Sequence, residues 1–131
     1  MITETLFCLA LNVYHEARSQ PLIEQLAVAQ VVLNRVGSTA YPNDVCSVVY
    51  HNKYPGRLHM CQFSWFCDGA NDTPRNAHAW VQANQIASLA LSSELPDLVG
   101  GATHYHATYV YPGWASSLEP VATIGRHRFY K

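Results

Sequence analysis

The sequence predicts an α+β fold that is mostly helical, with a few short strands late in the chain. Apolar residues recur at spacings of three and four in three long segments before residue 93, which is the period of an amphipathic helix. After residue 100, short runs rich in aromatic and β-branched residues alternate with turn signals, as is typical of short strands. There is no internal repeat or linker, so residues 1–131 are expected to form one domain.

The helical pattern predicts four helices. The first is expected over residues 3–18 and ends at Ser19-Gln20-Pro21. Proline suits the first turn of a helix, so a second helix should run over 21–36, with an apolar stripe wide enough for burial on more than one side. A short helix through 45–49 and a long helix over about 76–92 follow.

The remaining segments are expected to be loops and short strands. Residues 58–66 are aromatic and should be extended, with a turn at Asp68-Gly69. A second extended run is expected over 102–111, and the tail over 121–130 predicts one more strand around Gly125.

Charge and hydropathy exclude several classes of protein. A net charge of -1 gives no electrostatic basis for binding nucleic acid or an anionic membrane. No apolar run approaches the ~20 residues of a membrane span, so no membrane insertion is expected. The N-terminus lacks the basic region and apolar stretch of a secretory signal, which predicts a chain made in the cytoplasm, or one exported before a leader was removed.

The four cysteines give little evidence for a metal site. None forms a C-x-x-C pair, so a zinc ribbon is not expected. Cys8 lies within the first helical pattern and is expected to be a small core residue. Cys46, Cys61 and Cys67 leave room for one disulfide in an oxidising compartment, with its pairing open.

Glu16 is the most informative residue of the chain. It follows Leu9, Ala10, Val13 and Tyr14 in the first helical pattern, so much of its surroundings should be apolar. Burial without a full ion pair raises the pKa of a carboxyl group, and a carboxyl that stays protonated near neutral pH can act as a general acid on a glycosidic bond. The alternative is a surface glutamate paired with a nearby arginine (Arg18 or Arg35).

Two further clusters mix aromatic rings with amide, hydroxyl and imidazole groups. Such surfaces suit sugars, because pyranose rings have apolar faces edged with hydroxyls. The candidate substrate-binding residues are Gln62, Ser64, Trp65, Thr103, Tyr105 and His106. For an aromatic ring taken alone, such as Trp65, Tyr105 or Trp114, core packing is the competing interpretation.

A metal site is not expected. His104 and His106 would share one face of a strand, but no third ligand stands at a recognisable spacing. His15-Glu16 begins a metalloprotease motif, yet the residue four positions after His15 is Ser19. We therefore expect neither a metal nor another cofactor, with a zinc-dependent amidase as the alternative that would need one.

Taken in order, these motifs resemble the cell-wall hydrolases of the spore-cortex-lytic-enzyme type. The resemblance spans nearly the whole chain. It is carried by A-L-N-V-Y-H-E-A-R at 10–18, Q-L-A-V-A-Q-V-V-L-N-R-V at 25–36, C-Q-F-S-W at 61–65, G-A-T-H-Y-H-A at 101–107 and I-G at 124–125. The resemblance implies a lysozyme-like fold and cleavage between N-acetylmuramic acid and N-acetylglucosamine in peptidoglycan, with Glu16 as the catalytic glutamate.

The chain departs from this family directly after Glu16. Many members have glycine and a second glutamate where this chain has Ser19-Gln20. A single acid favours a lytic transglycosylase with a 1,6-anhydro product over a muramidase that hydrolyses the same bond. A non-catalytic glycan-binding module is the remaining alternative. The expected partner is the peptidoglycan glycan strand, acted on by a monomer, and a phage endolysin that reaches the wall after release is one context that fits.

Overall fold

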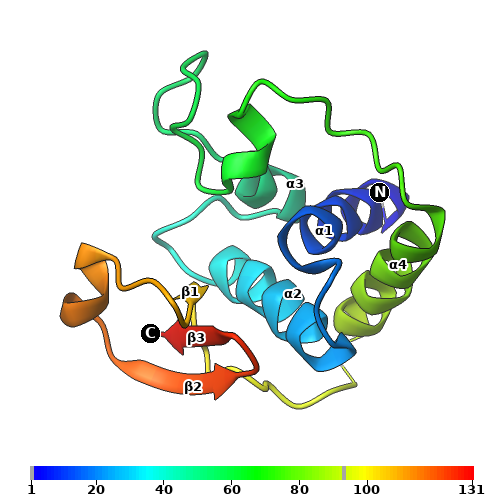
Figure 1. Ribbon diagram of the computed structural model, residues 1–131. Coiled ribbons are helices and arrows are strands. Elements are labelled where there is room, and N and C mark those ends of the chain that lie inside the picture. The colour runs from blue at the N-terminus through cyan, green and yellow to red at the C-terminus, as the bar shows by residue number, and fades with distance from the viewer. Residues whose placement is uncertain (1, 93) are drawn as a thin grey trace.

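A computed structural model describes residues 2–92 and 94–131 and confirms the α+β class (Figure 1). The helices and 3-10 helices are α1 (Ile2–Ala17), α2 (Leu22–Val36), α3 (Val45–Val49), η1 (Ser64–Cys67), α4 (Ala77–Leu91) and η2 (Gly113–Ser117). The strands are β1 (His104–Ala107), β2 (Pro120–Ile124) and β3 (His127–Tyr130), which form one antiparallel sheet in the order β1-β3-β2.

Side-chain caps define the start of two helices. The Asp44 carboxylate accepts a hydrogen bond from the backbone N–H of Ser47 at 2.9 Å and begins α3, and Asn76 accepts from Ala79 at 3.0 Å to begin α4. Pro21 precedes α2, and its carbonyl accepts from the N–H groups of Glu24 and Gln25. The predicted helix bounds therefore hold to within two residues.

Helix α2 is buried on two sides, as its wide apolar stripe predicts. Ala29 and Val32 belong to the larger core, which α1, α3 and α4 share with α2. Ala27 and Val31 contact a smaller core that includes Phe129 of β3. The helix thus lies between the other helices and the sheet (Figure 1), and it fixes how the sheet approaches α1. None of the helices within 2–92 and 94–131 combines the length and apolar character needed to cross a membrane.

Two segments differ from the sequence-based prediction. Residues 58–66 are not an extended run: they form turns, an isolated bridge between Asn52 and Cys61, and the start of η1. A disulfide between Cys61 and Cys67 closes this short loop, which leaves no length for a strand. The tail forms two strands rather than one, because Gly125 adopts a φ of 57° in the tight turn between β2 and β3.

The cysteine prediction is wrong for Cys8. It is buried, as expected of a core residue, but it pairs with Cys46 and so ties α1 to α3, with Cα atoms 5.2 Å apart. Cys61 and Cys67 form the second disulfide. Spacing along the chain does not reveal the first pair, since it depends on how two helices pack.

Candidate active site

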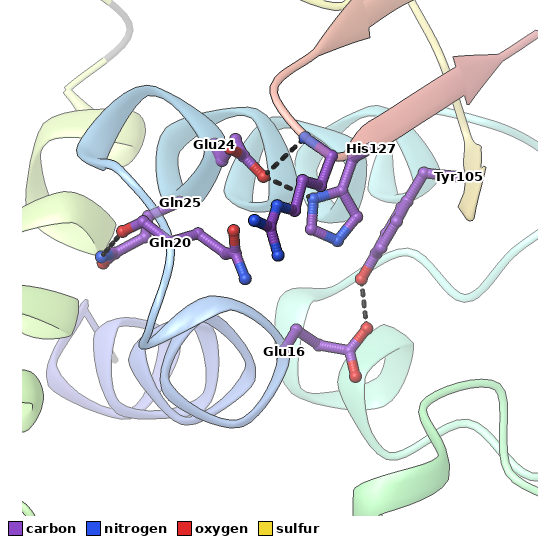
Figure 2. Close-up of polar contacts among 7 residues, drawn as sticks. Glu16, Gln20, Glu24, Gln25, Tyr105 and His127 are labelled. Carbon is purple, nitrogen blue, oxygen red and sulfur yellow. Dashed lines mark hydrogen bonds and ion pairs between the residues drawn. The ribbon is translucent and has the colours of Figure 1, made fainter. Parts of the chain in front are cut away.

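Glu16 lies in the last turn of α1 and faces the sheet (Figure 2). Its Oε1 accepts a hydrogen bond from the hydroxyl of Tyr105 in β1. Burial raises the pKa of the Glu16 carboxyl, against the opposing effects of the Tyr105 hydrogen bond and of the charges on His127, Arg35 and His15. The residue keeps some exposure, so a substrate can reach it. A partly exposed carboxyl that favours its protonated form is suited to donating a proton.

The arginines near Glu16 make other contacts. Arg18 is exposed, and its guanidinium donates to the carbonyl of Tyr14 at 3.4 Å. Arg35 is buried and donates through Nε to the carbonyl of Thr103 at 2.8 Å. Within the described residues, neither guanidinium forms an ion pair with Glu16. The interpretation of Glu16 as a surface ion-pair partner is therefore not supported.

Trp65 forms a wall beside the last turn of α1 rather than an open platform. It is 7% exposed, and its indole N–H donates to Oδ1 of Asn12 at 2.9 Å. The imidazole of His15, the neighbour of Glu16, stacks on it with ring centroids 4.4 Å apart. The Nε2 atom of the same imidazole lies 2.8 Å from the backbone carbonyl oxygen of Asp72. These contacts hold the end of α1 against η1.

Three other predicted binding residues have at least partly exposed positions near this wall or on the approach to β1. Gln62 and Ser64 are exposed on the loop that the Cys61–Cys67 disulfide closes. Thr103 is half-buried, and its hydroxyl lies 3.0 Å from Nδ1 of His104. None of the three has a hydrogen bond to Glu16 within the described residues; of the candidate binding residues, Tyr105 is the one joined directly to the Glu16 carboxyl.

His106, a predicted substrate-binding residue, is not brought together with Glu16. Successive side chains of a strand point to opposite faces, so His106 faces away from Tyr105. It is buried, its Nε2 lies 2.7 Å from the hydroxyl of Tyr130, and its ring packs against Trp114. His104 also contacts Trp114, which confirms that the two imidazoles share a face. Among the described residues, no three His, Cys, Asp or Glu side chains gather closely enough to hold a metal ion.

A buried glutamate–histidine pair behind Tyr105 was not predicted from the sequence. Glu24 of α2 is 2% exposed, and its Oε2 lies 2.8 Å from Nδ1 of His127 in β3. The same oxygen accepts from the backbone N–H of Arg126 at 3.3 Å (Figure 2). One signal was present in the sequence: Glu24 stands three, four and seven residues before apolar positions of α2, so it lies on the buried stripe.

A separate groove lies away from this site. It has a volume of about 670 Å³ and follows α4, lined by apolar and polar side chains that include Trp80, Leu89 and Glu94. It contains none of the candidate residues, and Glu94 is its one carboxylate. The groove therefore offers contact surface at a distance from the candidate acid.

Comparison with known proteins places the chain in a family. The family model described as "Cell Wall Hydrolase" matches residues 19–130, beginning just after Glu16. The spore cortex-lytic enzyme of Halalkalibacterium halodurans is 31% identical over 124 residues, which is 92% of this chain and 33% of the relative. That of Oceanobacillus iheyensis is 30% identical over 122 residues, 91% of this chain and 38% of the relative. The chain thus spans between a third and two fifths of the length of these relatives.

Solved structures share the fold over nearly the whole chain. The catalytic domain of the germination-specific lytic transglycosylase SleB from Bacillus anthracis superposes with a TM-score of 0.76 at 28% identity, covering 97% of this chain and 93% of that one. The catalytic domain of the Bacillus cereus SleB protein gives a TM-score of 0.76 at 28% identity, with 98% and 91% covered. These matches confirm the lysozyme-like α+β fold. The chain belongs to the cell wall hydrolase family.

Proposed function

We propose that residues 1–131 form one catalytic domain, a monomeric lytic transglycosylase that cleaves peptidoglycan between N-acetylmuramic acid and N-acetylglucosamine. The observation that carries the proposal is the partly buried Glu16 carboxyl, whose pKa is raised by burial and whose orientation is set by Tyr105. The family match and the structural relatives, one of which is the catalytic domain of a lytic transglycosylase, support the same chemistry.

Glu16 acts twice in this mechanism. Its protonated carboxyl first gives a proton to the oxygen of the glycosidic bond, and the bond between that oxygen and C1 of the muramic residue breaks. The resulting carboxylate then takes the proton of the muramic C6 hydroxyl as that oxygen bonds to C1. The product is a 1,6-anhydro ring, Glu16 regains its proton, and no water is consumed. The C6 hydroxyl is part of the substrate, so proximity replaces the second carboxylate of a hydrolase.

The residue that replaces the second glutamate of many relatives supports a single-acid mechanism. Gln20 follows α1 by three positions, and its side chain points toward the space between α1 and the β2–β3 turn (Figure 2). An amide at this place cannot serve as a base or as a nucleophile at neutral pH. We assign the sugar contacts to Gln62, Ser64, Trp65, Thr103 and Tyr105, and leave out His106 because it faces the other side of the sheet.

The deciding experiment is mass spectrometry of muropeptides after purified peptidoglycan is digested in heavy-oxygen water. A transglycosylase gives muramic ends that are lighter by one water, carry no label and resist borohydride reduction. A lysozyme digested in parallel provides the labelled, reducible control. Label at a free reducing end would make the enzyme a muramidase, with Asp68 the first carboxylate to test. Intact glycan strands with released peptides would support the amidase, and unchanged peptidoglycan would support a binding module.

We also propose that the enzyme acts outside the reducing cytoplasm, after release in phage lysis or after secretion. Both disulfides support this place of action, because disulfides persist in oxidising compartments. The test is the redox state of the four cysteines. Thiol labelling should find them reduced in intact producing cells if the chain waits in the cytoplasm, and oxidised in protein recovered from the wall. Free thiols in wall-bound, active protein would contradict the proposal.

A further inference from the structure

The buried Glu24–His127 pair has no role in the mechanism proposed for Glu16, although burying these two groups costs them most of their hydration. Glu24 is 2% exposed and His127 is 9% exposed, so both groups have lost most of their hydration. Burying an acid and a base is unfavourable unless the pair is close and further hydrogen bonds satisfy it. Here the Oε2–Nδ1 distance is 2.8 Å, and the backbone N–H of Arg126 binds the same oxygen. A hydrophobic pair of similar volume often stabilises a fold equally well, so the presence of a carboxyl group and an imidazole at this place calls for another explanation.

The pair is connected to the general acid through one aromatic ring. The His127 imidazole packs edge-on against the ring of Tyr105, with centroids 5.5 Å apart and an interplanar angle of 74°. The hydroxyl of Tyr105 in turn donates a hydrogen bond to Glu16. Glu24 contacts Nδ1 of His127. The second ring nitrogen has no hydrogen-bond partner among the residues that the structure describes, and it points toward the Tyr105 hydroxyl and Glu16 (Figure 2).

We propose that Glu24 and His127 are positioning residues for Glu16: Glu24 fixes the orientation of the His127 ring, and His127 holds Tyr105 in place and lies close enough for its charge, when protonated, to act on the acid. This inference rests on the proposed function only in naming Glu16 as the acid. A carboxylate bound to one nitrogen of an imidazole fixes both its orientation and the nitrogen that carries the proton.

The charges around the two groups determine the sign of the effect. Glu16 is faced by Tyr105 from β1, His127 from β3, Arg35 from α2 and His15 from its own helix. His127 is faced by Glu24 from α2, with Arg126 next to it in the β2–β3 turn. Burial raises the pKa of Glu16, and the cation at His127 opposes this rise. Loss of the cation should therefore leave Glu16 protonated up to a higher pH.

The first test uses the unmutated protein. The carboxyl carbons of glutamate and the ring carbons of histidine are labelled with ¹³C, and both are followed by NMR across the pH range in which the fold persists. If His127 is coupled to Glu16, the Glu16 signal shows a second inflection at the pH where the His127 ring titrates. A His127 ring that stays neutral throughout, or a Glu16 signal with one inflection that ignores His127, would overturn the proposal.

The second test compares Glu24→Gln, Glu24→Asp and the exposed control Glu94→Gln. Glu24→Gln keeps the hydrogen-bonding shape but removes the charge. The alkaline limb of kcat/KM on soluble glycan strands should then move to higher pH, with activity at the wild-type optimum about tenfold lower. Glu24→Asp should restore the profile in part, and Glu94→Gln should not change it. An equal loss at every pH would show a structural role only. If no glycosidic product forms at all, the proposed function fails, while the NMR coupling still decides this inference.

Discussion

The hydroxyl of Tyr105 donates a hydrogen bond to Oε1 of Glu16 across 89 positions of sequence. This hydrogen bond joins the helical part of the molecule to the sheet at the candidate acid. Helix α2, buried against both parts, sets the distance between them. The geometry of the acid therefore depends on the packing of α1, α2 and β1 together, and not on α1 alone.

Replacing Glu16 with glutamine should abolish catalysis. The amide keeps the size of the side chain and can still accept the Tyr105 hydrogen bond, but it can neither give nor take the catalytic proton. We expect turnover of purified peptidoglycan to fall by roughly a hundredfold or more, the usual scale for a general acid–base group. Retention of more than half of the wild-type rate would mean that Glu16 is not the acid.

The same substitution should change how stability depends on pH. The folded protein raises the pKa of Glu16 above its ordinary value of 4.5, so it binds this proton more tightly than the unfolded chain does. The resulting stability is complete below the unfolded pKa and is lost as pH rises through the folded pKa. Glutamine has no such dependence. Urea unfolding should show Glu16→Gln gaining stability over wild type as pH rises, with the difference vanishing in acid. A constant difference at all pH values would contradict the raised pKa.

Tyr105→Phe tests the hydrogen bond to the acid. The phenol hydroxyl favours the charged form of Glu16, so its removal should raise the pKa of Glu16 and move the alkaline limb of the rate profile to higher pH. Activity at the optimum should fall about tenfold, the worth of one hydrogen bond to a charged group. Tyr109 is 82% exposed, so Tyr109→Phe serves as the matched control. Equal profiles for the two variants would remove Tyr105 from the site.

The sequence was sufficient to predict the helices and the apolar surroundings of Glu16, because both follow from local apolar periodicity. The sequence did not predict the features that depend on contacts between elements far apart in the chain. The Cys8–Cys46 disulfide depends on how α1 packs against α3. The burial of Trp65 depends on its packing against α1, where Asn12 accepts a hydrogen bond from the indole N–H. The position of His106 follows from a local rule. Side chains alternate along a strand, so His106 shares a face with His104 and lies on the opposite face from Tyr105.

Chelation should not affect the enzyme. His104 and His106 share a face, but within the described chain no third ligand joins them, and Ser19 occupies the position where a metalloprotease motif would need histidine. Dialysis against a strong chelator is expected to leave the rate of muropeptide release unchanged. A loss of activity that stoichiometric zinc restores would instead favour the amidase.

Gly125→Ala should lower the free energy of unfolding more than Gly56→Ala does. Gly125 has a φ of 57°, and a Cβ built there would overlap the carboxylate of Glu24. Gly56 also has a positive φ, 83°, but its Cβ would meet nothing within 4 Å. Both alanine variants share the backbone cost of a left-handed conformation, roughly 1–2 kcal/mol. Only Gly125→Ala must also displace a buried carboxylate from His127, which adds about 2 kcal/mol of overpacking. Urea unfolding should reveal this extra loss, together with reduced activity in the folded fraction. Equal losses of stability in the two variants would show that Glu24 can move aside without cost.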